Sequence, residues 1–366
     1  MSSADPALQS VSYELADAFD ANELYQQNGW TDGLPIVPPT EERVREFLDT
    51  SGWRPADVIG VDPLRRWPIT AEKLAINAVM AGCLPAYFPV VVAVFQAMCR
   101  PEFNLHGSTA STGGSAQLII VNGPIRTEIG MNATHNVLGN ASRANATIGR
   151  AVRLTLINVL ECIPGRLDRS TFGQPGKFTY CIAEDEEDSP WPALAQERGV
   201  AAGASAVTVM GASGPRQILN EWTQDPEEIL ETFAAEMRHN MLTYSIWSGN
   251  YTILIPKQLR ELIAAAGWTR RDIQEYIFKS ARLYRREWAK VGKRNVVDRG
   301  GGPDQEFTAL RSPDALLIVA AGGPAGGYGI VIPPWLGPRS IAQTQQIGLV
   351  EPVGLEDKRQ EAAQGL

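Results

Sequence analysis

Three short apolar segments, each followed at once by a turn rich in glycine and proline, constrain most strongly how this chain folds. They are residues 117–121, 206–210 and 315–319. Apolar runs without polar alternation are typical of strands buried on both faces of a sheet. Apolar residues recur with helical spacing at residues 13–27, 41–48, 69–82, 85–98, 144–161, 226–238, 256–265 and 270–289. The sequence therefore predicts a layered α/β fold, rich in helix, with buried strands that end in glycine-rich turns.

The acidic, proline-containing stretch at residues 184–192 is typical of an exposed connector between domains. We take residues 1–190 as an N-terminal helical segment with an α/β region that carries two histidine loops. Residues 191–366 then form a C-terminal α/β region. A single domain remains the alternative.

Composition excludes several classes of protein. The chain has 33 Lys and Arg against 41 Asp and Glu, a formal charge of −8, so nucleic acid is not an expected partner. The first residues do not resemble a signal peptide, and the longest apolar stretch, residues 86–98, is well short of the roughly 20 residues that cross a bilayer. Four scattered cysteines without a C-x-x-C pair predict reduced thiols. We expect a cytoplasmic protein without a membrane partner, and its nine tryptophans favour a homo-oligomer.

Two of the three histidines, His106 and His135, lie in polar, glycine-rich segments on either side of the first strand. Imidazole serves as acid, base or metal ligand, and the neighbouring hydroxyls of Ser108 and Thr109 can orient a substrate. One crossing of the sheet would put the two histidines at opposite ends, whereas a fold-back of residues 108–115 would bring them together. Alternatively, each imidazole only fixes its own loop. His239, at the end of a predicted helix, is interpreted as structural.

Cys83 is the best candidate nucleophile, because it stands where one predicted helix ends and another begins. A helix N-terminus favours thiolate and lowers the pKa of a thiol; the alternative is a small core residue. Glu184, at the end of a predicted strand, is a candidate base. With His106 and His135 it would also complete a divalent-metal site, although no H-x-H or H-E-x-x-H spacing supports one. The alternative to both roles of Glu184 is that it belongs to a solvated acidic surface.

A second glycine-rich segment follows the last of the three strands. Gly322, Gly323 and the residues up to Tyr328 and Gly329 lack the G-x-G-x-x-G spacing and a P-loop lysine, so no nucleotide cofactor is predicted. Five glycines in eight positions carry a large entropy cost, which favours close approach of a ligand to the backbone beside Tyr328. A mobile lid or a tight turn is the alternative.

Four segments together resemble a largely uncharacterised bacterial family of similar length, associated with small proteins that bear a Cys/Sec-Gly-Ser-Cys (UGSC-type) motif. They are WTDGLP at 30–35, AVMAGC at 78–83, PEFNLHG at 101–107 and RANATIGR at 143–150. The resemblance implies that these segments contribute to a site, and it makes a thiol-dependent or redox partner conceivable. The chain lacks the Cys-Gly-Ser-Cys motif itself.

The leading hypothesis is a cytoplasmic enzyme that acts on a small polar metabolite by hydrolase or lyase chemistry. His106 and His135 supply acid and base, while Arg143 or Arg150 holds an anionic group by a bidentate contact. Asn132 and Asn145 complete the predicted binding residues. The alternatives are a subunit of a two-component thiol- or selenol-dependent redox system, whose partner is a small Cys-rich protein, and a small-molecule binding protein without turnover.

Overall fold

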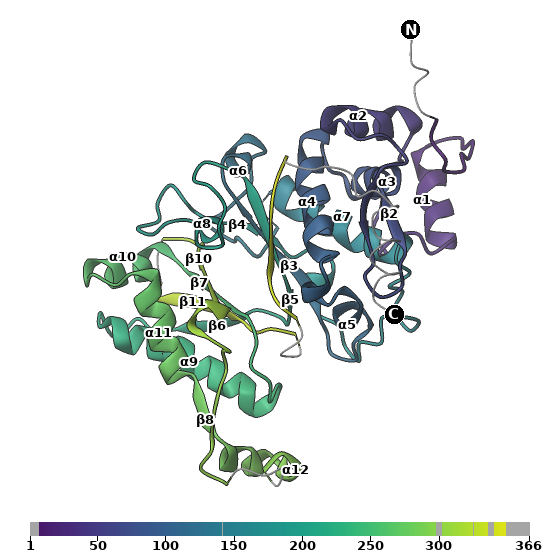
Figure 1. Ribbon diagram of the computed structural model, residues 1–366. Coiled ribbons are helices and arrows are strands. Elements are labelled where there is room, and N and C mark those ends of the chain that lie inside the picture. The colour runs from purple at the N-terminus through teal and green to yellow at the C-terminus, as the bar shows by residue number, and fades with distance from the viewer. Residues whose placement is uncertain (1–6, 141, 298–301, 325, 336–339, 349–366) are drawn as a thin grey trace, which may run out of the picture.

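The computed structural model describes residues 7–140, 142–297, 302–324, 326–335 and 340–348 (Figure 1). The helices are α1 (Ala18–Gln27), α2 (Glu41–Ser51), α3 (Ala71–Ala81), α4 (Phe88–Met98), α5 (Leu105–Ala110), α6 (Ile125–Glu128), α7 (Arg143–Asn158), α8 (Leu194–Glu197), α9 (Pro226–Thr243), α10 (Lys257–Ala265), α11 (Arg270–Ser280) and α12 (Arg294–Val297). The strands are β1 (Val58–Val61), β2 (Pro68–Thr70), β3 (Ala116–Asn122), β4 (Cys181–Ala183), β5 (Ala206–Ala212), β6 (Arg216–Leu219), β7 (Tyr251–Ile255), β8 (Arg282–Tyr284), β9 (Glu306–Thr308), β10 (Leu316–Ala320), β11 (Tyr328–Ile332) and β12 (Gln343–Gln346).

Two mixed four-stranded sheets form the centre of the molecule (Figure 1). The first has the order β12-β5-β3-β4, in which only the pair β3–β4 is parallel. The second has the order β10-β7-β11-β6, in which only β10–β7 is parallel. Strands from both sides of residue 190 share the first sheet, because β5 and β12 pair beside β3 and β4.

Alternate side chains of each sheet enter different cores, as the two-residue period of a strand requires. Ile119 of β3 packs with the helices α3, α4 and α7, and Ile318 of β10 packs with α9, α10 and α11. Their neighbours Ile120 and Val319 meet in a third core, which contains residues of both sheets. The layers are therefore helices, first sheet, second sheet, helices, and the predicted α/β layering is confirmed.

The two sheets are also joined at both ends by backbone hydrogen bonds. Just beyond β4, Asp185 N donates to Ala320 O of β10 (2.7 Å). Beyond β5, Ser213 N donates to Pro333 O (3.0 Å). β4 and β10, each parallel to its own neighbour, thus have their carboxyl ends close together at one edge of the molecule. Ligands of α/β folds commonly bind at such an edge.

Most predicted elements are present, with two instructive differences. The helix predicted at 270–289 ends at Ser280, because residues 282–284 pair with β9 as strand β8. The strands predicted at 117–121 and 206–210 form β3 and β5, but they are antiparallel. Their glycine-rich turns therefore lie at opposite edges of the sheet.

Candidate functional site

The N-terminal turn of α7 is tied to the loop that carries His135. Ser142 caps the helix, and its hydroxyl also donates to Gly130 O (3.0 Å). Asn145 and Asn132 form a reciprocal pair, in which each donates to an oxygen of the other at 2.9 Å. The side chain of Asn132 also donates to His135 O (2.8 Å), so the His135 loop is fixed at several points. Two predicted binding residues, Asn132 and Asn145, therefore position this loop.

The exposed imidazole of His135 lies against the glycine-rich segment that follows β10. A Cβ atom placed on Gly323 would lie 3.1 Å from His135 Cδ2, and Gly322 N donates to Ala133 O (2.9 Å). From the sequence we expected His135 and the glycine-rich segment in one site, and the fold brings them close together. We call His135, Asn132, Asn145, Arg143, Gly322 and Gly323 the α7 cluster.

Arg143 and Arg150, both on α7, have different surroundings. Arg150 forms a bidentate ion pair with Asp32, with two hydrogen bonds of 2.8 Å, and also donates to Pro35 O. Burial opposes ionisation of Asp32, but the Arg150 hydrogen bonds and charge hold the pKa of Asp32 below its ordinary value. The prediction that Arg150 grips a ligand by a bidentate contact is therefore wrong, because Asp32 already occupies that face.

Arg143 is exposed at the first position of α7 and is the arginine left for a ligand. Its Nε donates to Gly82 O (3.0 Å), and its outer guanidinium nitrogens have no partner among the residues that the structure describes. Three of the four segments that carry the family resemblance, 30–35, 78–83 and 143–150, meet through Asp32–Arg150 and Gly82–Arg143.

Cys83 lies beside this helix but is not an activated thiol. Burial raises its pKa to about 12, and the opposing effects of the Thr147 hydroxyl, Arg143 and Arg150 are smaller. The expectation of a lowered pKa is wrong, because desolvation outweighs these lowering effects and because Cys83 follows the C-terminal end of α3 and lies before the first turn of α4. Burial also raises the pKa of Cys181, and the charge of Cys83 adds to that effect.

His106 lies at the other end of β3 from the His135 loop. Its short helix, α5, packs against the start of the β3–β5 pair, where Ser108 approaches Gly211. The hydroxyls of Ser108 and Thr109 both donate to Leu105 O of the same helix, so the expected role of orienting a substrate is not supported. The fold-back that would have joined the two histidines does not occur. His106 Nδ1 is buried and lacks a partner among the described residues.

Glu184 belongs to a fully buried ion pair that links the two halves of the molecule. Its carboxylate accepts from Arg270 Nη2, from Asn122 Nδ2 (2.6 Å) and from Leu194 N (2.8 Å). A carboxylate so occupied is not available as a catalytic base. Within the described part of the chain, no group of three His, Cys, Asp or Glu side chains can hold a metal ion. The conditional metal set of His106, His135 and Glu184 is therefore not assembled.

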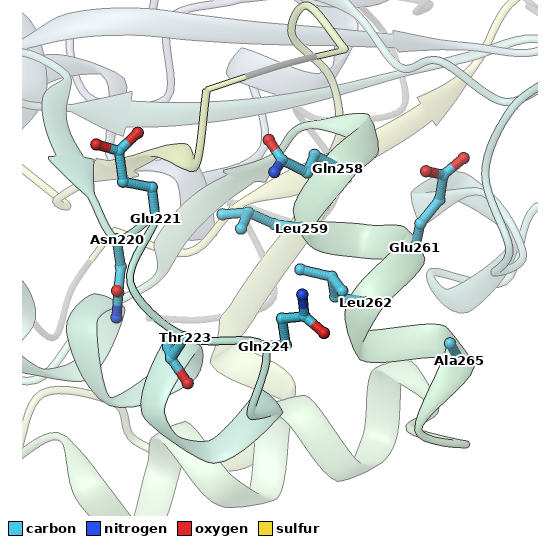
Figure 2. Close-up of a pocket in the computed structure, with 9 residues that line it drawn as sticks. All are labelled: Asn220, Glu221, Thr223, Gln224, Gln258, Leu259, Glu261, Leu262 and Ala265. Atoms are coloured by element: carbon cyan, nitrogen blue, oxygen red, sulfur yellow. The ribbon is translucent and has the colours of Figure 1, made fainter.

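The second half of the glycine-rich segment lies beside Gln258 of α10 and not beside His135. Gly326 N and Gly327 N both donate to Gln258 Oε1 (2.9 and 3.1 Å), so these amides are satisfied by the protein itself. Tyr328, 46% exposed, opens β11 and packs over Gly326. Gln258 also borders a surface hollow of about 370 Å3 between α10 and residues 220–224, with Leu259 among its apolar residues and Glu261 at its side (Figure 2).

Sequence reasoning missed a hollow at the carboxyl ends of β3 and β4. It has a volume of about 400 Å3 and is lined by Asn122, Arg126, Glu186 and Glu187, among others. The acidic run was interpreted as a connector, as solvated surface or, at Glu184, as a base at the end of a strand. That position after a buried strand was the signal that also indicates a pocket at Glu186 and Glu187.

No family model, no curated protein and no solved structure matches this chain. No helix among the described residues is long and apolar enough to span a membrane.

Proposed function

We propose that this protein is an enzyme that acts on a small anionic metabolite by acid–base chemistry at the α7 cluster. The observation that carries the proposal is the contact between His135 and Gly323, in a loop fixed on α7 by the Asn132–Asn145 pair. Positioned imidazole beside an open backbone segment is a common arrangement for proton transfer. We place the enzyme in the cytoplasm, as the sequence predicts.

Each residue of the cluster has a separate role in this proposal. His135 takes a proton from the substrate or from an attacking water molecule and returns it to the leaving group, which fits hydrolase or lyase chemistry. Arg143 binds the anionic group through its outer guanidinium nitrogens, supported by the positive end of the 16-residue helix α7. Gly323 keeps the space beside the imidazole open. Asn132 and Asn145 are positioning residues.

The test starts with a panel of small carboxylates and phosphate esters, screened for a shift in melting temperature of the full chain. Compounds that bind are then followed for product formation by mass spectrometry. We expect His135→Ala to abolish turnover but retain binding, and Arg143→Gln to weaken binding. His239→Ala, an exposed histidine on α9, is the matched control and should behave as wild type.

Full turnover in His135→Ala would refute the assignment, and loss of turnover in His106→Ala alone would move the chemistry to the other end of β3. Ligand-dependent melting without any product in the wild type would favour the binding protein without turnover.

A second candidate function is a subunit that receives a reactive thiol or selenol from a small Cys-rich partner. The meeting of segments 30–35, 78–83 and 143–150 beside exposed Arg143 favours it. Because burial raises the pKa of Cys83, we assign the reactive thiol or selenol of this candidate to the partner chain. Purification from the native source should then recover the partner, and Cys83→Ser should remain able to bind it. Turnover by the isolated chain, without a partner, would refute this candidate.

We also propose a homo-oligomer, as the sequence predicts, in which a partner subunit would cover exposed aromatic side chains such as Phe172 and Trp222, 98% and 77% exposed. Light scattering that gives a monomer at micromolar concentration would contradict it.

A further inference from the structure

The hollow at the carboxyl ends of β3 and β4 is separate from the α7 cluster and has its own chemistry. Asn122 is the last residue of β3, and Glu186 and Glu187 follow β4. The backbone of this corner admits only glycine at position 123. Gly123 has φ +85°, and a Cβ there would lie 2.4 Å from Ala204 O. The position of Asn122 at the floor of the hollow is therefore fixed by close packing.

The buried amide of Asn122 keeps one acceptor without a partner. Its Nδ2 donates to Glu184 Oε2 (2.6 Å) and to Glu186 Oε1 (2.8 Å), which uses both of its hydrogens and fixes the orientation of the amide. Asn122 is 1% exposed, and its Oδ1 has no partner among the described residues. A buried polar atom without a partner is costly, so this oxygen requires an explanation.

The charged donor of the hollow, Arg126, is already occupied, whereas acceptors remain. Arg126, 5% exposed, directs its guanidinium at Gly123 O, Glu184 O and the Glu187 carboxylate. Glu186 Oε1 accepts from Gly123 N and Asn122, and its Oε2 has no partner in the described part of the chain. One guanidinium faces two carboxylates, which leaves a net negative charge. An anion would find little to bind here.

We propose that this hollow binds the primary ammonium group of a small aliphatic amine. The ammonium donates to Glu186 Oε2 and, at the floor, to Asn122 Oδ1, and its positive charge balances the excess carboxylate. The wall formed by Ala193, Ala201 and Ala204 accepts a short alkyl chain. A metal ion is a poorer occupant, because no group of three carboxylate, thiol or imidazole ligands is present among the described residues.

Isothermal titration of the full-length protein with n-butylamine at neutral pH tests the proposal, with n-butanol and butyrate as ligands of equal length. We expect saturable binding of the amine alone. Glu186→Gln should weaken it by about tenfold or more, because a hydrogen bond to a charged group is lost. Glu221→Gln, which removes a carboxylate from the other hollow, is the matched control and should leave the affinity unchanged.

A second variant keeps the test decisive if Glu186→Gln does not fold. Ala201 is exposed at the rim of the hollow, so Ala201→Trp should preserve the fold and block the amine. No amine binding by the wild type, equal binding of n-butanol, or unchanged affinity in both variants would overturn the proposal.

Discussion

Glu184→Gln should destabilise the protein more than any comparable substitution of an exposed carboxylate. The substitution removes the buried counter-charge of the Arg270 guanidinium, which is 3% exposed, and leaves it only the more distant carboxylate of Glu197, at 3.5 Å. It also replaces one carboxylate oxygen by an NH2 group, which cannot accept a hydrogen bond either from Arg270 Nη2 or, in the other orientation of the amide, from Asn122 Nδ2 and Leu194 N. Removing one partner of a buried ion pair costs about 3–5 kcal/mol, and we expect a loss of this size.

Urea unfolding, followed by tryptophan fluorescence and circular dichroism, measures the change in the free energy of unfolding. The matched control is Glu261→Gln, which removes the carboxylate of an exposed pair with Lys257 and should hardly move the midpoint. The double variant Glu184→Leu/Arg270→Leu removes both charges. It should lose less stability than Glu184→Gln, because neither buried charge remains and only the part-exposed Glu197 loses a partner.

A loss below about 1 kcal/mol in Glu184→Gln would refute the reasoning, because it would mean that Arg270 finds water or another partner. The same measurement separates stability from catalysis. If Glu184→Gln retains turnover under conditions where it is folded, its carboxylate takes no part in the reaction.

Three further predictions concern α7 and its neighbours. Cys83 should resist iodoacetamide at pH 8 in the folded protein and react after unfolding, since a pKa of about 12 leaves about one thiolate in ten thousand; rapid modification of the native protein, located by mass spectrometry, would contradict the burial argument. The stability lost in Asp32→Asn should be greatest above the ordinary pKa of an aspartate and should shrink as the pH falls through the lowered pKa of Asp32. The reason is that a group whose folded-state pKa is depressed stabilises the fold only while it is ionised. A loss that stays constant from neutral to acidic pH would disprove the role of the Arg150 pair. Gly322→Ala should lower the melting temperature, since Gly322 has φ +109°. Gly323→Val should displace His135 and impair ligand binding, with little effect on the melting temperature. Unchanged ligand binding with a lowered melting temperature in Gly323→Val would show that Gly323 serves the fold alone.

Local patterns in the sequence identified the buried strands and the helix starts. Thr40 and Thr70, residue types that favour helix N-caps, cap α2 and α3, and their hydroxyls accept from Arg43 N and Lys73 N. The patterns could not indicate how the strands pair, because burial on both faces is the same for parallel and antiparallel neighbours. The antiparallel pairing of β3 and β5, and the facing of two sheets across a shared core, follow from tertiary packing.

The candidate site was predicted only in part, because local sequence patterns do not indicate which loops meet in the folded protein. Composition singled out His135 and Gly323, but nothing local indicates that a loop after β3 contacts a turn after β10. Arg143 and Arg150 have similar neighbours along α7, and only the tertiary position of Asp32 decides which of them is occupied. For Cys83, the sequence shows that the residue lies between two helices, but it does not show the burial that raises the pKa of the thiol.

The acidic run after β4 shows how one surface-like segment acquires several structural functions. Glu184 pairs with Arg270 of α11, and Asp185 pairs with Arg260 of α10. These two carboxylates each have a buried arginine, because the chain leaves β4 where both sheets and two helices meet. Glu186 and Glu187 instead share Arg126, at distances of 3.2 and 2.8 Å. In the hollow beside this joint one guanidinium therefore faces two carboxylates, and a cationic ligand there would restore neutrality.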